Sequence, residues 1–96
     1  AFAPVSPVDS ARFRLVSGSE LLKEFRSSPG KARVFCSNCG SPIYSALDAR
    51  PEVKRLRLGT VETPFVCGDV FHIFYASKAP WLDCDDTHPH FAERRP

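Results

Sequence analysis

The chain has 96 residues, a length typical of one domain, and its 43% hydrophobic and 25% charged residues are ordinary for a globular protein. Its formal net charge of +2 is too weak to indicate binding to nucleic acid or to an anionic membrane. Aromatic residues make up 11% of the chain, which argues against intrinsic disorder. We therefore expect a single domain over residues 1–96, without nucleic-acid or membrane partners.

The beginning of the sequence favours a cytoplasmic chain. The first eight residues lack the basic and apolar regions of a secretion signal, and without secretion a reducing compartment is expected. The chain starts with Ala1 and contains no Met. We expect that it was processed or is a fragment of a longer protein.

Nine prolines and five glycines interrupt the chain at short intervals, which favours strands and turns over long helices. The pattern predicts an extended arm or edge strand over 1–7, a helical turn capped by Asp9 or Ser10, and a strand over 13–17. A short helical turn over 19–22 leads into a strand through Phe25.

The remainder continues this pattern of short strands. Ser28-Pro29-Gly30 predicts a tight turn, because Pro presets φ and Gly accepts a positive φ. Further strands are predicted at 32–35, 43–47, 53–61 and 70–76. The last of these is the most apolar run, and its β-branched and aromatic residues indicate a buried central strand. From Asp83 onward we expect an irregular surface segment, and the whole is mainly β with at most short helical turns.

The most informative motif is the C-x-x-C-G of Cys36, Cys39 and Gly40. Two thiolates at this spacing reach one Zn²⁺ when the backbone turns tightly between strands, and Gly40 permits the left-handed conformation that closes such a turn. A redox C-x-x-C would open a helix, whereas Pro42 and a strand follow here. Zinc ligation is the preferred interpretation, ahead of a disulfide and of two unconnected buried cysteines.

A structural zinc site requires four ligands, and this pair supplies two. The sequence leaves the others open. The candidates are Cys67, Cys84, His72, His88 and His90.

Several stretches, in their order and spacing, resemble the glutathione-dependent formaldehyde-activating enzyme (GFA) family, to which centromere protein V also belongs. They cover nearly the whole chain. The stretches are 13–18, 25–31, 33–44, 57–61, 72–73 and 77–81. The most specific are F-C-x-x-C-G-S-P at 35–42 and S-K-A-P-W at 77–81.

This resemblance implies packed, twisted β-sheets similar to the Mss4-like fold, and a structural zinc held by four cysteines. Cys36 and Cys39 match the later two of those four. The resemblance also implies a second, catalytic zinc on a C-x-C-x-x-C motif. The implied reaction is the reversible addition of glutathione to formaldehyde, which gives S-hydroxymethylglutathione and is of the carbon–sulfur lyase type.

The chain departs from this family pattern, because both of the other cysteine motifs belong upstream of Ala1. The resemblance therefore implies half of the structural zinc site and no ligands for the catalytic zinc, and we expect this form to be inactive. Cys67 and Cys84 have no counterpart in the family pattern, so no role transfers to them.

Three residues are candidates for a substrate pocket. His72 is interpreted as a hydrogen-bonded core or pocket histidine, with substrate binding and metal ligation as less favoured roles. Trp81 packs over the end of the sheet or lines a pocket, and Lys78 is solvated or binds a carboxylate of glutathione. His88 and His90 are interpreted as surface polar residues.

The expected partners are glutathione, or another small thiol adduct, and a second copy of the chain. Two chains that each donate Cys36 and Cys39 would complete one tetrahedral Zn²⁺ site in a homo-oligomer. A zinc-knuckle binding module for protein or nucleic acid is the least favoured hypothesis.

Overall fold

The computed structural model describes residues 2–84 and 86–96, which divide into two compact units. The sheet unit is Ala3–Glu62. The tail unit comprises Phe2 and residues 63–84 and 86–96. Among the described residues, no helix is long and apolar enough to cross a membrane.

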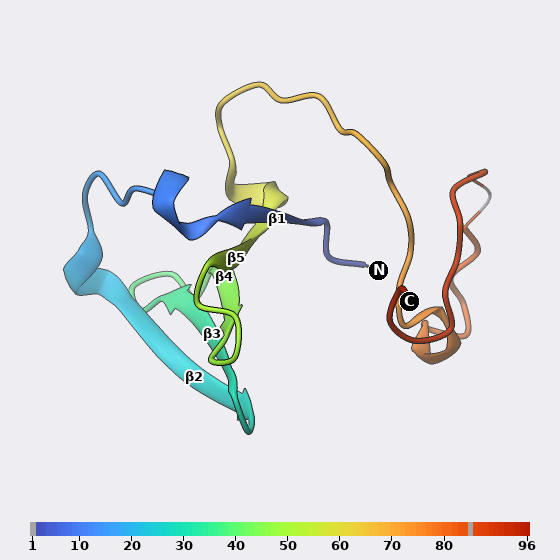
Figure 1. The fold of residues 1–96 in the computed structure, drawn as a ribbon, viewed down its shortest axis with the longest axis horizontal. Coiled ribbons are helices and arrows are strands. Elements are labelled where there is room, and N and C mark those ends of the chain that lie inside the picture. Colours follow the sequence, from blue (N-terminus) through green and yellow to red (C-terminus); the bar gives the residue numbers. More distant parts are fainter. Residues whose placement is uncertain (1, 85) are drawn as a thin grey trace. The chain divides into compact units, whose positions relative to one another are not determined.

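The sheet unit contains one five-stranded antiparallel sheet with the strand order β1-β5-β4-β3-β2 (Figure 1). Its strands are β1 (Val5–Asp9), β2 (Leu22–Ser28), β3 (Lys31–Cys36), β4 (Pro42–Leu47) and β5 (Val53–Arg57). The helical elements described are single 3-10 turns at Ser10–Arg12, Ser19–Leu21, Leu58–Thr60 and Tyr75–Ser77. The predicted mainly β class is confirmed.

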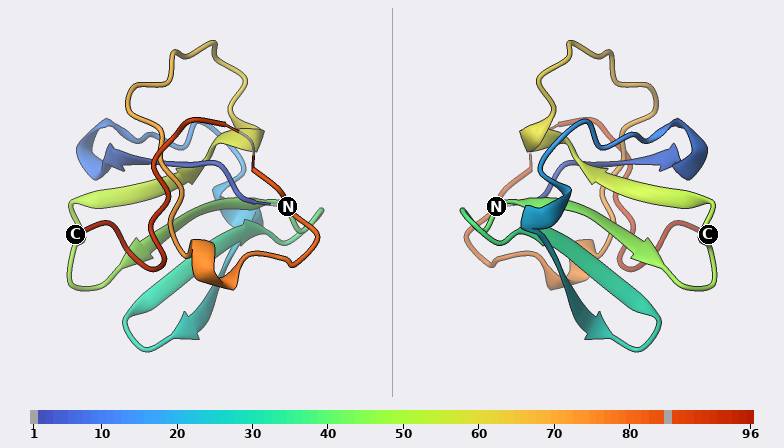
Figure 2. Two further views of the ribbon diagram at one scale, coloured as in Figure 1. Left: turned by 90° about the vertical axis from the view of Figure 1, so that its right-hand side faces the viewer. Right: turned by 90° about the vertical axis from the view of Figure 1, so that its left-hand side faces the viewer.

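Short connections between consecutive strands place β2, β3, β4 and β5 side by side, and β1 pairs with the remaining edge of β5. The predicted turn at 28–30 joins β2 to β3, with Gly30 at φ +77°. Figure 2 shows the twist of the resulting hairpin. Asp9 caps the first 3-10 turn as predicted, because its Oδ1 accepts a hydrogen bond from the Ala11 N–H at 3.4 Å. The strand predicted over 53–61 ends at Arg57, where the turn Leu58–Thr60 begins.

The most buried side chains lie at the centre of the sheet. Ala32 and Val34 project from β3, and Ser45 is buried on β4. The intervening Arg33 is exposed, as the alternation of a strand requires. Tyr44 of β4 is the cross-strand partner of Val34. The core is therefore small and centred on β3 and β4, two of the three inner strands.

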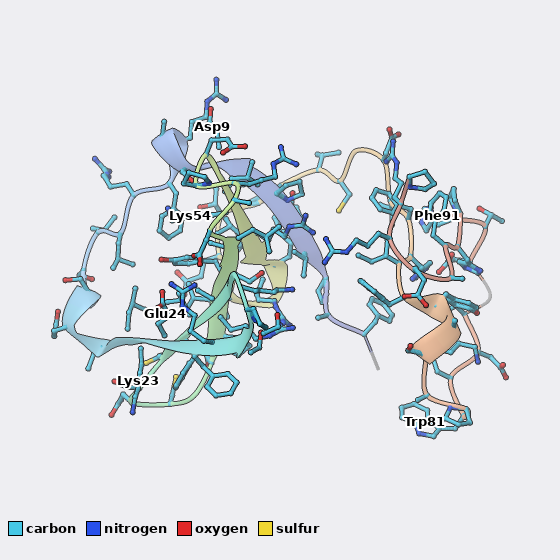
Figure 3. All side chains as sticks on the ribbon, turned by 60° about the horizontal axis from the view of Figure 1, so that its bottom comes forward. Asp9, Lys23, Glu24, Lys54, Trp81 and Phe91 are labelled. Atoms are coloured by element: carbon cyan, nitrogen blue, oxygen red, sulfur yellow. The ribbon has the colours of Figure 1, made fainter. Side chains whose placement is uncertain are left out.

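The strand predicted over 13–17 is wrong. Phe13 follows a 3-10 turn and packs its ring against Tyr44, with the centroids 5.3 Å apart. The ammonium of Lys54, which is labelled in Figure 3, lies 5.6 Å from the Phe13 centroid. The neighbouring Val16 is 81% exposed. An alternating pattern forms a strand only when another strand is available to pair with it. Because β5 is already paired on both sides, with β1 and β4, it offers no edge to residues 13–17.

The buried central strand predicted over 70–76 is also wrong. Only His72 of this run makes a bridge, a parallel one to His90, and Phe74 has φ +53°. That left-handed conformation ends the extended backbone, and the 3-10 turn Tyr75–Ser77 follows. The segment from Asp83 onward is irregular as predicted wherever the structure describes it; Asp85 lies outside the described residues.

Candidate metal centre at the cysteine knuckle

The C-x-x-C-G motif forms a closed turn between two strands, as predicted. Cys36 is the last residue of β3, and Cys39 lies in the turn that precedes β4. The Gly40 N–H donates to the Cys36 carbonyl at 2.7 Å, and the Cys36 N–H donates to the Ser41 carbonyl at 2.9 Å. Gly40 has φ +80°, which a glycine adopts without strain. The cysteine knuckle, residues 36–41, is thus fixed by its own backbone.

A neighbouring strand holds the knuckle in place. The Ser37 N–H donates to the Leu21 carbonyl at 2.7 Å, and Leu22 of β2 is the cross-strand partner of Cys36. The base of the turn is therefore attached to the sheet, while the Cys39 side chain is exposed.

The hydrogen bonds around Cys39 favour its thiolate. Its Sγ lies 3.2 Å from Ser41 Oγ. Hydrogen bonds from the Ser41 hydroxyl, the Ser41 backbone N–H and the Cys36 thiol lower the pKa of Cys39, in that order of effect. The thiolate is the form that binds metal and attacks electrophiles, so the turn prepares Cys39 for either role.

The chemistry of this pair fits one half of a thiolate zinc site. All four cysteines are free thiols. Within the sheet unit, no carboxylate, histidine or further cysteine forms a three-ligand group with Cys36 and Cys39. The sequence candidates for the missing ligands, Cys67, Cys84 and the three histidines, belong to the tail unit.

The sheet unit also contains a shallow, open groove of about 630 Å³ beside β1. It is lined by Pro7, Val8, Asp9, Arg12, Phe13, Arg14 and Leu56. Two guanidinium groups and one carboxylate line this groove, so its net charge is positive and would attract an anionic ligand.

The three pocket candidates all lie in the tail unit. His72 is 14% exposed at its side chain, and its Nε2 lies 2.9 Å from Asp86 Oδ2. The Lys78 Nζ donates to the Leu82 carbonyl at 3.0 Å, and Trp81, labelled in Figure 3, is 73% exposed. His72 is thus hydrogen-bonded and half-buried, Lys78 is engaged within its own turn, and Trp81 is open to solvent.

Sequence reasoning missed Asp86, although it is central to the surroundings of His72. The hydrogen bond from His72 and then the His88 N–H, which donates to Oδ1 at 3.0 Å, lower the pKa of the Asp86 carboxyl. The only sequence indication was an acidic residue four positions before His90. That spacing is too common to identify a site.

Fold and knuckle define a small, mainly β protein with two thiols paired in a tight turn between strands. The family model described as "Glutathione-dependent formaldehyde-activating enzyme" matches residues 1–77, and the chain belongs to this family of zinc-binding, carbon–sulfur lyase-like proteins. No curated protein and no solved structure shows a significant match to the chain. The matched region contains the knuckle and His72 but ends before Lys78 and Trp81.

Proposed function

We propose that the chain is a zinc-binding domain of the carbon–sulfur lyase type, in which Cys36 and Cys39 are ligands of a structural Zn²⁺. The observation that supports this proposal is the turn itself, which places two thiols at one end of the sheet and lowers the pKa of Cys39. A bound Zn²⁺ would hold these sulfurs as thiolates and lock the connection between β3 and β4. The ion would stabilise the fold, because Cys36 and Cys39 both lie in a turn that is closed by its own backbone hydrogen bonds.

The substrate class that the family implies is a thiol adduct of formaldehyde with glutathione. Activation of the thiol in such a reaction requires a metal centre with an open position, and the knuckle supplies only two ligands from the sheet unit. We therefore propose that the cysteine knuckle by itself does not accelerate the reaction. Glutathione, an anionic peptide, matches the charge of the groove that Arg12 and Arg14 line.

Cobalt substitution tests the structural site directly, because thiolate ligation of Co²⁺ gives intense charge-transfer absorption. We expect this absorption in the wild-type chain, its loss in the C36S/C39S variant, and its retention in the C67S/C84S control. Absorption that survives C36S/C39S would contradict the assignment. Turnover of glutathione and formaldehyde above the uncatalysed rate, if C36S/C39S abolishes it, would contradict the proposed inactivity of the knuckle.

A second candidate function is a zinc-linked homodimer, and the sheet edge favours it. β2 is an edge strand, and Phe25 on it is 60% exposed. Cys36 is paired across the ladder with Leu22 of the same strand, so an interface along β2 would adjoin the knuckle. Exposed edges with apolar side chains tend to pair with another chain, and a two-fold axis would bring together two half-sites.

Native mass spectrometry combined with the cobalt titration tests this dimer. We expect a dimer whose charge-transfer absorption saturates at one cobalt per two chains, and a monomer for C36S/C39S. Phe25→Thr introduces a β-branched residue suited to a strand but removes the apolar ring, so it should weaken association. Val66→Thr is the matched control, since Val66 is 97% exposed and lies outside the strands. Saturation at one cobalt per monomer would rule out the shared site.

A further inference from the structure

A second group of metal-ligating side chains lies in the tail unit, separate from the cysteines. His72, Asp86 and His90 each present a ligand atom, and these three atoms all lie within 4.8 Å of one another. The His72 Nε2 is 2.9 Å from Asp86 Oδ2, and the His90 Nε2 is 3.7 Å from Asp86 Oδ1. In both histidines, Nε2 is thus the ring nitrogen that faces the Asp86 carboxylate.

These separations suit one metal ion. Zinc bonds to nitrogen and oxygen measure about 2.0–2.2 Å, which puts neighbouring ligand atoms of a tetrahedral ion roughly 3.3 Å apart. The two distances to the Asp86 carboxylate lie on either side of that value. The nitrogen pair is at most 4.8 Å apart, so closure on an ion requires only rotations about side-chain bonds.

Backbone hydrogen bonds hold the two histidines in register. His72 and His90 form a parallel bridge, in which the His72 N–H donates to the Pro89 carbonyl and the Phe91 N–H donates to the His72 carbonyl, each at 2.8 Å. The Tyr75 N–H donates to the Phe91 carbonyl at 3.0 Å and continues the contact between the segments. The site is therefore built on paired backbone and not on side chains alone.

Aromatic rings hold the imidazoles in their orientations. Tyr75 stacks on His90 with centroids 4.2 Å apart and an interplanar angle of 10°. Phe2 meets His72 edge to face at 5.7 Å. The His88 N–H donates to Asp86 Oδ1 at 3.0 Å and orients the carboxylate. Such outer contacts fix the direction of ligand atoms and raise metal affinity.

We propose that His72, Asp86 and His90 form a binding site for a divalent transition metal such as Zn²⁺ or Co²⁺, independent of the cysteine knuckle. Two imidazoles and one carboxylate are ligands that these ions accept. Three protein ligands leave at least one coordination position for water or a small ligand. Binding replaces the proton on each Nε2, which moves to Nδ1 or to solvent. Asp86 and His90 lie beyond the region that the family model matches, so the family match does not assign this site.

Cobalt binding to the full chain carrying C36S/C39S isolates this site from the thiol pair. We expect this variant to bind one Co²⁺ per chain, with ligand-field absorption and without the charge-transfer absorption of thiolates. Asp86→Asn, which keeps the shape of the side chain, and His90→Ala, each added to C36S/C39S, should weaken binding about tenfold or more. His88→Ala is the matched control, because it removes only the imidazole and keeps the backbone N–H that contacts Asp86, so its affinity should not change.

NMR on the same samples separates ligation from adventitious surface binding. Paramagnetic shifts and broadening should be largest for the imidazole resonances of His72 and His90 and smaller for those of His88. Slow amide exchange at His72 and Phe91 in the Asp86→Asn variant would show that the paired backbone persists. Either of two results would overturn the proposal: no cobalt bound by C36S/C39S, or equal affinity and broadening whichever histidine or carboxylate is replaced.

Discussion

Gly40 provides the backbone conformation that closes the cysteine knuckle. Its φ of +80° lies in the left-handed region, and its N–H donates to the Cys36 carbonyl at 2.7 Å. A Cβ added there would meet no atom within 4 Å, so any cost of a side chain comes from the conformation alone. At this position a single residue type therefore determines whether two thiols can face one ion.

We predict that Gly40→Ala lowers the free energy of unfolding by about 1 kcal/mol and weakens cobalt binding at the knuckle. Gly59→Ala is the control, because Gly59 also has open space around its Cβ position but no positive φ. That variant should be neutral or slightly stabilising. Urea denaturation measures both, and equal stability of the two variants would contradict the argument.

Glu52 is a second single-residue feature, with a pKa lowered first by its own backbone N–H and then by Arg50. The Arg50 Nε donates to Glu52 Oε1 at 3.1 Å. Because the pKa is lower in the folded chain, the ionised carboxyl contributes stability above the unfolded pKa. That contribution disappears as the pH falls through the folded pKa.

We predict that Arg50→Gln raises the pKa of Glu52 only part of the way to its usual value, since the backbone hydrogen bond remains. Carbon-detected NMR titration of the Glu52 carboxyl measures the shift. The stability difference between wild type and variant should be present at neutral pH and vanish at pH values where Glu52 is protonated in both. A difference that grows toward low pH would have the wrong sign.

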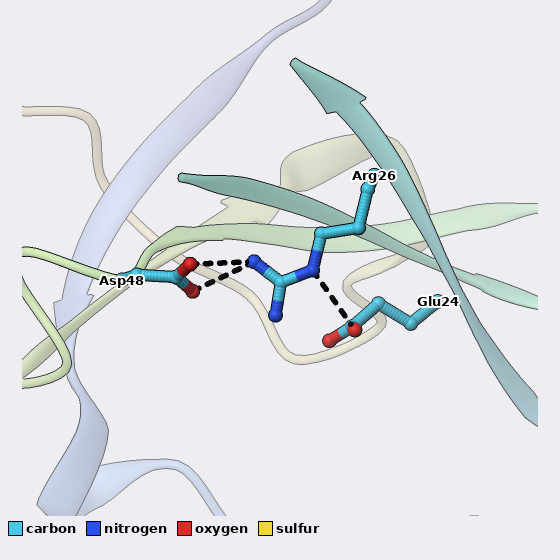
Figure 4. A network of polar contacts seen from close by, with 3 residues as sticks. All are labelled: Glu24, Arg26 and Asp48. Carbon is cyan, nitrogen blue, oxygen red and sulfur yellow. Dashed lines mark hydrogen bonds and ion pairs between the residues drawn. The ribbon is translucent and has the colours of Figure 1, made fainter. Parts of the chain in front are cut away.

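At the scale of elements, an ion-pair network joins the edge strand β2 to the end of β4. The Arg26 Nη1 donates to both carboxylate oxygens of Asp48 at 2.8 and 2.7 Å, and its Nε donates to Glu24 at 3.3 Å (Figure 4). Arg26 and Asp48 lie 22 positions apart in the chain. The network therefore ties together two parts of the sheet, whereas the pair of Arg50 and Glu52 is local.

We predict that Arg26→Gln destabilises the sheet more than Arg50→Gln does. Only the first substitution removes a contact between distant segments, in which one guanidinium nitrogen donates to both carboxylate oxygens of Asp48. Both pairs are exposed, so the losses are small and shrink as added salt screens the charges. Urea denaturation at low and high salt measures both variants. A larger effect of Arg50→Gln, or a loss independent of salt, would contradict this assignment.

At the scale of the whole molecule, the sheet unit and the tail unit are joined through a segment without strand or helix at 61–71. Phe65 and Val66 in this segment are exposed. Proteases cut exposed, irregular segments before they cut paired strands. The connection is therefore more accessible to cleavage after an aromatic residue than the paired strands of the sheet are.

We predict that chymotrypsin cuts first after Phe65, before it cuts after Phe35 or Tyr44 in the sheet. Mass spectrometry of a brief digest identifies the products, and the fragment ending at Phe65 should persist. Phe65→Ser should remove this early cut and leave later ones unchanged. Initial cleavage within β3 or β4 would contradict the division into units.

The sequence predicted correctly those parts of the fold that depend on interactions between residues close together in the chain. The turn at 28–30 and the cysteine knuckle were correct because local chemistry decides them: Pro and Gly set φ, and two residues separate the thiols. The strand over 13–17 was wrong because Phe13 packs on Tyr44, a contact between distant positions that periodicity does not report.

By itself, the sequence determined the mainly β class, the knuckle between two strands and the family, since each depends on local spacing or on motifs in order. Only the tertiary structure decided the conformation of the apolar run at 70–76. Its residues favour a strand, but His72 makes a single bridge to His90 and Phe74 adopts a left-handed conformation that ends the extended backbone. The same bridge brings His72 to the Asp86 carboxylate. Backbone pairing between segments that are separate in the chain creates that cluster, and no local pattern encodes it.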